Sequence, residues 1–200
     1  MRNQFEFLGI KSPAAKGLLR ELMTEQGLPE PEHLEAIVKA LWGWPEREYQ
    51  YAALTLLDKS QKKLTLASVP LLAYLITTKS WWDTVDSIVI HNLGKLLRQY
   101  PAGRDLTLAP WRCSENLWLR RTTLLYQLDY KTDTDERLLF ALVIENRDSS
   151  ELFIQKAIGW ALREYSKTAP ETVKSFVDST ELAPLSRREA LKWMKAKGQL

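Results

Sequence analysis

The chain has 200 residues, of which 45% are hydrophobic and 26% are charged, with only 8 glycines and 9 prolines. It is too apolar to be disordered and too poor in glycine and proline to be collagen-like, so we expect one folded domain or a short repeat array. The single cysteine, Cys113, excludes an internal disulfide, and a net charge of +3 does not by itself identify a nucleic-acid-binding protein.

Several classes of protein find no support in the sequence. No stretch has the composition of a signal peptide or approaches the roughly 18 apolar residues of a membrane span, which predicts a cytoplasmic protein with no membrane partner. His33 and His91 have no partner at metal-ligand spacing, and phosphate-loop and dinucleotide-binding motifs are missing, so we predict neither a metal site nor a cofactor. Eight tryptophans against two histidines favour stacking or cation recognition over imidazole chemistry.

Apolar residues recur at helical spacing along almost the whole chain, beginning with Leu18, Leu19 and Leu22, and no sustained alternation predicts a strand. Signals for the start of a helix follow at regular intervals. They are Pro45, Ser80 with Asp83, Asn116, Ser150, and Ser186 with Glu189 as a capping box. These starts lie 35, 36, 34 and 36 residues apart, and so constant a period predicts an internal repeat.

Each period also contains a second run of helical spacing. These runs cover residues 66–78, 106–113, 133–146 and 170–179, and the last period holds only the half 186–198. Two helices in about 35 residues are typical of stacked helical hairpins. We therefore predict an all-α fold, a HEAT-like helical-repeat solenoid that forms a single domain over residues 1–200 and offers a concave binding face.

The period places one position of each first helix in a common row. Steps of 35 residues connect Tyr51, Asp86, Arg121 and Lys156. Trp82 and Trp160 lie four residues from members of this row, and residues four apart share a helix face. The row therefore predicts a groove that carries charged and aromatic side chains.

Structural roles are an alternative for the same residues. Asp86 and Arg121 also suit an acid–base ladder that ties neighbouring repeats together, because isolated pairs of this kind are usually structural. Trp82 and Trp160 equally suit the core, given the aromatic content of buried helices. We assign the other tryptophans to packing, namely Trp42, Trp44, Trp81, Trp111, Trp118 and Trp193.

Four segments resemble the AlkD-like family of bacterial DNA alkylation repair proteins. They are TKSWWDTVD at 78–86, NLWLRR at 116–121, FIQKAIGWALREY at 153–165 and LAPLSRREA at 182–190. The resemblance implies a HEAT-like repeat fold and a DNA glycosylase that removes purines alkylated at N3 or N7. It places the catalytic cluster of that family on Trp82, Asp86, Arg121 and Trp160, with all four residue types kept.

The same resemblance implies duplex DNA as the partner, held through its phosphate backbone on the concave face. The family is associated with cleavage of the damaged base while it remains stacked, which an open groove would suit. Basic residues near the row and in the last half-repeat are the candidate DNA contacts. They are Lys79, Arg120, Lys156, Arg163, Arg187 and Arg188. We expect a monomer that needs no cofactor or metal.

One departure from the family pattern keeps a second hypothesis open. The chain reaches the segment FEFLGI at residues 5–10 almost at once, whereas in the glycosylases an additional N-terminal helical portion precedes it, so about one helix pair is expected to be missing. A short subgroup of the superfamily is thought to bind nucleic acid without excising bases. The alternatives are therefore a glycosylase, a non-catalytic nucleic-acid-binding module and a protein-binding solenoid.

Overall fold

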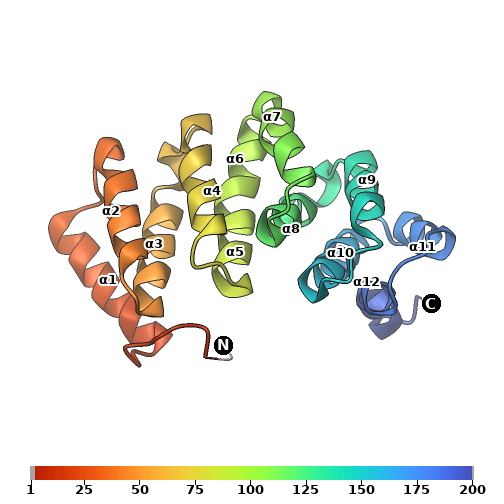
Figure 1. Cartoon of the computed structure of the whole chain (residues 1–200), viewed down its shortest axis with the longest axis horizontal. Helices are drawn as coiled ribbons and strands as arrows, with labels where there is room; N and C mark the ends of the chain where they lie inside the picture. The colour runs from red at the N-terminus through yellow and green to blue at the C-terminus, as the bar shows by residue number, and fades with distance from the viewer. Residues whose placement is uncertain (1–2, 200) are drawn as a thin grey trace. The chain divides into compact units, whose positions relative to one another are not determined.

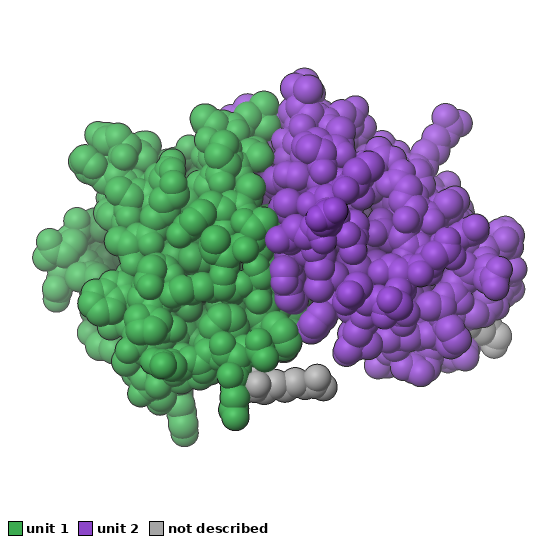
Figure 2. Space-filling model, viewed as in Figure 1, with its two compact units in different colours: residues 1–92 green, residues 93–200 purple. Residues whose placement is uncertain are grey.

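The computed structural model describes residues 3–199. Within these residues the chain consists of helices and turns, and extended pairing is limited to a single bridge between Glu6 and Glu46. The all-α prediction is therefore confirmed. The chain divides into two compact units, residues 1–92 and residues 93–200 (Figure 2). None of the helices between residues 3 and 199 is both long and apolar enough to cross a membrane.

The first unit is built around α3, which packs against α1, α2 and α5 (Figure 1). Its helices are α1 (Ser12–Gln26), α2 (Pro31–Gly43), α3 (Arg47–Lys59), η1 (Gln61–Lys63), η2 (Leu66–Ser68), α4 (Val69–Thr77) and α5 (Trp82–Ser87). Fully buried aliphatic side chains such as Val38, Leu57 and Leu75 form the core. The helix α5 continues into a π-helical stretch, Ile88–Leu93, a local geometry that is frequent near functional sites.

The second unit is built around α10, which packs against α8, α9, α11 and α12 (Figure 1). Its helices are α6 (Gly94–Gln99), α7 (Pro101–Arg112), α8 (Leu117–Leu125), η4 (Lys131–Asp133), α9 (Glu136–Asn146), α10 (Leu152–Tyr165), α11 (Pro170–Ser179) and α12 (Pro184–Ala196). Ile154, Ile158 and Leu162 recur on one face of α10 and are fully buried. This face supplies the centre of the core.

The predicted period appears in the helix boundaries. The helices α3, α5, α8 and α10 begin 35 residues apart, and α12 begins 32 residues after α10. A second helix or helical pair lies between each of these starts, so the prediction of two helical runs in each period is confirmed. The segment 101–104 contains a proline and a glycine but forms the first turn of α7, because proline is well tolerated at the first helical positions.

The predicted cap at Asn116 is confirmed, whereas those at Ser80, Ser150 and Ser186 are wrong. Pro45 is not in the first turn of α3, which begins at Arg47. Ser150 does not cap α10, because Glu151 occupies the N-cap position. Asn116 caps α8, since its Oδ1 accepts hydrogen bonds from the backbone N–H of Trp118 and Leu119. Ser80 does not cap α5, which begins at Trp82 without any side-chain cap. The capping box at Ser186 is also wrong, because α12 already begins at Pro184 and Ser186 lies buried inside it.

The assignment of tryptophans to packing is also right for some residues and wrong for another. Trp42 and Trp111 are buried, as expected for packing residues. Trp44 is 56% exposed, so its assignment to packing is wrong. It lies in the turn after α2, and the centroid of its ring is 5.4 Å from that of Tyr49.

Candidate functional site

The helix α5 carries two of the predicted site residues. Trp82 is the first residue of the helix and is 49% exposed, so it is not a core anchor. Asp86 lies one turn later and is 7% exposed. Because residues four apart share a helix face, one turn presents an accessible indole beside a buried carboxylate. A carboxylate in such surroundings acts on nearby charge with little screening by water.

The start of α5 is held by Arg47, the first residue of α3. Its side chain is fully buried and forms an ion pair with Asp83. The guanidinium donates to both carboxylate oxygens of Asp83, at 3.1 Å from Nε and 2.7 Å from Nη2. It also donates to the hydroxyl of Thr84 and to the backbone carbonyl of Lys79, each at 2.8 Å. Arg47 of the preceding hairpin therefore binds residues both before and after Trp82 in the sequence.

Tyr51, a member of the predicted row, joins the same cluster. Its hydroxyl donates to Oδ2 of Asp83 at 2.7 Å. Burial, together with the hydrogen bond and the negative charge of Asp83, raises the pKa of Tyr51 to about 12. The phenol therefore remains a protonated donor at neutral pH. The residues of the row do not make the same contact in every repeat. Tyr51 contacts α5, the first helix of the following repeat.

The turn before α5 is fixed from the other side by α2. Lys79 has a positive φ of 47°, and its ammonium donates to the carbonyls of Gly43 and Trp44 at the end of α2. Burial, followed by the nearby charge of Arg47, lowers the pKa of Lys79. The indole N–H of Trp42 donates to the hydroxyl of Thr78 at 3.1 Å. Lys79 thus satisfies the orphan carbonyls of a helix end, and its predicted contact with DNA stays a prediction.

An extended N-terminal segment, residues 5–10, is bound to the first turn of α3. The carboxylate of Glu48 accepts hydrogen bonds from the backbone N–H of Leu8, Gly9 and Ile10, at 3.0, 2.9 and 3.2 Å. Burial by itself would raise the pKa of Glu48, but these backbone hydrogen bonds outweigh it and lower the pKa. The ring of Phe5 lies over the Arg47 guanidinium, 3.8 Å from its centroid. Glu48 therefore binds the N-terminal segment, and Arg47 contacts both this segment and the start of α5.

A groove of about 730 Å³ lies within the first unit, between this N-terminal segment, α1 and α3. Leu18 and Leu22 of α1 line it and are more than half exposed. Its charged lining consists of Glu48, Asp58, Asp83 and Lys16. Carboxylates outnumber lysines there, so the lining favours apolar groups over phosphates.

In the second unit, Arg121 lies in α8 and is 4% exposed. Its Nη1 donates to the backbone carbonyl of Phe153, and its guanidinium lies 5.9 Å from the centroid of that ring. Phe153 is the second residue of α10. Arg121 therefore connects one helix of the row to the start of the next, as Tyr51 does in the first unit.

Trp160 lies in α10 and is partly exposed. The residue before it, Gly159, marks a close approach to α12. A Cβ atom added at Gly159 would lie 2.5 Å from the Cβ of Glu189 and 2.9 Å from the carbonyl oxygen of Ser186. Glycine is required here by space, and this close crossing fixes α10 against α12.

The other predicted DNA contacts differ in how they are engaged. Arg120 donates to the carbonyl of Ser114 at 2.7 Å, and Arg163 pairs with Glu189 at 2.7 Å. Arg187 pairs with Asp178 at 2.6 Å and also donates to the carbonyl of Val177. Lys156 and Arg188 are exposed. Lys156 and Arg188 therefore have the side chains most accessible to a phosphate. The contacts of all these residues with DNA stay predictions.

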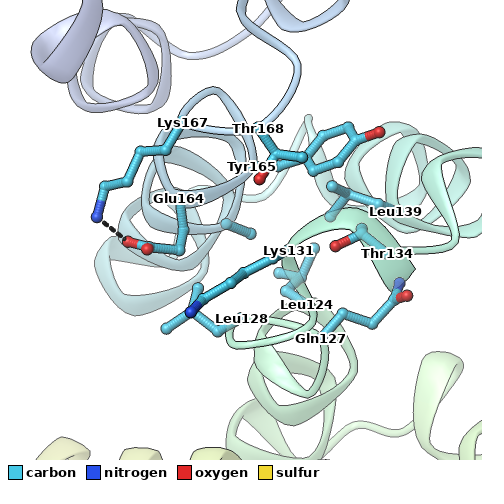
Figure 3. Close-up of a pocket in the computed structure, with 11 residues that line it drawn as sticks. Leu124, Gln127, Leu128, Lys131, Thr134, Leu139, Glu164, Tyr165, Lys167 and Thr168 are labelled. Atoms are coloured by element: carbon cyan, nitrogen blue, oxygen red, sulfur yellow. Dashed lines mark hydrogen bonds and ion pairs between the residues drawn. The ribbon is translucent and has the colours of Figure 1, made fainter. Parts of the chain in front are cut away.

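A smaller cavity of about 180 Å³ lies at the ends of α8 and α10 in the second unit. Figure 3 shows Lys131 and Lys167 at its edge, with Lys167 paired to Glu164 at 2.6 Å. None of the predicted site residues lines it. Across residues 3–199, no group of three or more histidine, cysteine or acidic side chains is arranged to hold a metal ion.

Sequence reasoning missed Arg47 and Glu48. A usable signal existed, because Arg47 precedes Asp83 by 36 residues, close to one period. A basic residue paired with an acidic one at the repeat distance is the pattern that a contact between neighbouring hairpins would leave.

Comparisons with known proteins give one consistent result. The family model described as DNA alkylation repair enzyme matches residues 1–194. A solved structure of a protein from Enterococcus faecalis, described as a predicted DNA alkylation repair enzyme, is 36% identical and superimposes with a TM-score of 0.89. The similarity covers 96% of this chain and 90% of that one. No curated protein matches significantly.

Proposed function

Because the chain belongs to the DNA alkylation repair enzyme family, we propose that it is a DNA glycosylase that excises cationic N3- or N7-alkylated purines from duplex DNA. The observation that carries the proposal is in α5, where Trp82, which is 49% exposed, shares a helix face with the buried carboxylate of Asp86. These two groups are the ones that a positively charged leaving base and its sugar require.

The chemistry of the substrate explains the residue types. A purine alkylated at N3 or N7 is already a cation, so its glycosidic bond is weakened and the base leaves without being protonated. A second carboxylic acid, which glycoside hydrolases use, is therefore unnecessary. The enzyme has only to stabilise positive charge on the base and on an oxocarbenium-like sugar as the bond breaks.

The proposed groups can supply this stabilisation. An indole face attracts a cation by about 0.5–2 kcal/mol. A carboxylate at about 4 Å from the sugar cation contributes on the order of 4 kcal/mol at an effective dielectric constant of about 20. With Trp82 and Trp160 as the two aromatic faces and Asp86 as the carboxylate, the sum is roughly 5–8 kcal/mol, or about 10⁴- to 10⁶-fold in rate.

Arg121 and the surface cations would hold the DNA. Arg121 is 4% exposed, which suits a fixed positive charge acting on a backbone phosphate from within the protein better than a mobile surface contact. The exposed Lys156 and Arg188 would make direct phosphate contacts. Phosphate contacts release counterions, so DNA affinity should fall steeply between about 50 and 200 mM salt.

The test is release of base under single-turnover conditions. Excess protein is incubated with duplex DNA that contains 7-methylguanine, and free base is quantified over time. Asp86→Asn should reduce the rate at least tenfold, because the amide carries no negative charge. Asp148→Asn is the matched control, since the Asp148 side chain is 91% exposed and lies outside the proposed site.

Each other result has a definite meaning. Release that Asp86→Asn leaves unchanged rejects the mechanism. Salt-dependent DNA binding without any release rejects the enzyme and favours the non-catalytic nucleic-acid-binding member of the family. Binding that does not respond to salt rejects phosphate recognition and favours a protein partner.

A further inference from the structure

The start of α5 is organised from outside the helix. No side chain of its own turn caps it, and Trp81 occupies the N-cap position. The contacts that fix this turn come instead from Arg47, which binds the carbonyl of Lys79, the carboxylate of Asp83 and the hydroxyl of Thr84. Lys79 precedes Trp82, and Asp83 and Thr84 follow it. The guanidinium thus brackets the residue whose indole is exposed.

The burial of Arg47 makes this arrangement rigid. Its side chain is fully buried and that of Asp83 is 11% exposed, so either charge alone would be strongly destabilising in this environment. Nε, Nη1 and Nη2 all donate hydrogen bonds, and the ring of Phe5 covers the guanidinium face. The guanidinium is planar and its N–H groups point in fixed directions, so it fixes the positions of the groups that accept its hydrogen bonds.

We propose that Arg47 is a positioning residue for base excision, and that its guanidinium, with the Tyr51 hydroxyl, sets the placement of Trp82 and Asp86 through the first turn of α5. This inference rests on the proposed function. Arg47 would touch neither the DNA nor the leaving base. It would act because an error of about 1 Å in the position of a reacting group costs up to about a hundredfold in rate.

Tyr51 is the second residue of α3 that binds Asp83. It donates to Oδ2 of Asp83, the oxygen that also accepts the Arg47 Nε hydrogen bond. The two residues lie one turn apart on α3 and converge on the same carboxylate. Removing one hydroxyl leaves the ion pair in place, so Tyr51→Phe is a milder version of the same perturbation.

The experiment compares Arg47→Lys and Tyr51→Phe with a matched control. Lysine keeps the positive charge but cannot donate from three nitrogens in a plane, so it cannot serve Lys79, Asp83 and Thr84 together. Arg104→Lys is the control, because Arg104 of α7 also forms an ion pair with a residue at the start of a later helix, Asp135 at the N-cap of α9, at 3.0 Å. The helix that follows Asp135, α9, carries none of the proposed site residues.

Two readouts are measured on folded protein, well below the melting temperature of each variant. The first is the single-turnover rate of 7-methylguanine release alongside the DNA dissociation constant. We expect Arg47→Lys to slow release about 10- to 100-fold and Tyr51→Phe about 3- to 10-fold, with DNA affinity changed less than twofold. Arg104→Lys should leave both quantities unchanged.

The second readout does not depend on activity. Protein labelled with 5-fluorotryptophan gives a fluorine signal for each of its eight tryptophans, and Trp82→Phe assigns the Trp82 signal. Arg47→Lys and Tyr51→Phe should shift that signal while leaving the signals of Trp111 and Trp193 in place. A loss of global stability alone would not select Trp82. If Arg47→Lys does not fold, Tyr51→Phe carries both readouts.

The outcomes separate this inference from the proposed function. A Trp82 signal that stays in place in the folded variants overturns the positioning role whether or not the protein excises bases. Unchanged release in both variants, with active wild-type protein, also overturns it. Wild-type protein that releases no base rejects the proposed function, while the fluorine signals still decide whether Arg47 places Trp82.

Discussion

The first turns of α5 and α8 are held in place by different kinds of contact. The helix α8, which carries Arg121, is capped by the neighbouring Asn116, whose Oδ1 accepts from the N–H of Trp118 at 2.9 Å. The helix α5, which carries Trp82 and Asp86, has no side-chain cap and is held by Arg47 from 35 residues before its first residue. One start depends on local contacts, and the other depends on the preceding hairpin.

The difference matters for how the two helices respond to change. A local cap can be lost with a small penalty, because water replaces it at a partly exposed helix end. A buried guanidinium and carboxylate cannot be separated so cheaply, since the remaining charge has no access to water. We therefore expect the placement of Trp82 and Asp86 to be sensitive to substitutions in α3, and the placement of Arg121 to depend mainly on α8 itself and on its neighbour α10.

The largest expected effect is that of Asp83→Ala. It leaves the fully buried Arg47 without its counterion, and breaking a buried pair in this way costs about 3–5 kcal/mol. Urea denaturation followed by circular dichroism measures the loss. The double variant Arg47→Met with Asp83→Leu is the control and should recover most of the stability, because no charge then stays buried. A loss below about 1 kcal/mol in Asp83→Ala would mean that the pair is not buried in solution.

A smaller effect is expected at α8. Asn116→Ala removes a cap that serves two backbone N–H groups, which typically costs about 1 kcal/mol. Ser150→Ala is the matched control, because Ser150 precedes α10 by one position too many to act as its N-cap. It should change the free energy of unfolding by less than about 0.5 kcal/mol. Equal losses in the two variants would contradict the assignment of a local cap to α8 alone.

These two helix starts also show what the sequence could reveal. The 35-residue period, the all-α class and the cap at Asn116 follow from patterns within a few neighbouring residues or from their repetition. The failure at Ser80 has a physical reason, because the groups that fix α5 lie on α3 and the sequence near α5 contains no sign of them. Ser186 failed for a related reason, since its hydroxyl donates to the carbonyl of Gln155 in α10 at 3.0 Å.

The candidate site also contains residues that the sequence could predict and residues that it could not. The row of residues at 35-residue steps singled out Tyr51, and the structure gives it a contact one repeat ahead. The exposure of Trp82 could not be predicted, because apolar and functional tryptophans produce the same helical spacing. Glu48 could not be predicted either, because its partners are backbone N–H groups, which leave no trace in the identity of residues 8–10.

The smallest expected effect is local and depends on pH. The pKa of Glu48 is lowered in the folded protein from an ordinary value of 4.5, so the ionised carboxylate stabilises the bound N-terminal segment. For a lowered pKa, this contribution is complete above the ordinary value and is lost as the pH falls below about 4.5 and through the folded value. Hydrogen exchange at the amides of Leu8, Gly9 and Ile10 measures the opening of the segment.

Exchange at these three amides should therefore accelerate in acid relative to its intrinsic rate, while amides in the core of α3, such as that of Leu57, stay protected. Glu48→Gln should remove most of the pH dependence, because a neutral amide oxygen accepts hydrogen bonds without titrating in this range. A pH dependence that persists in Glu48→Gln would assign it to another carboxylate. Since Phe5 of the same segment covers Arg47, opening that also shifts the fluorine signal of Trp82 would connect the N-terminal segment to the start of α5.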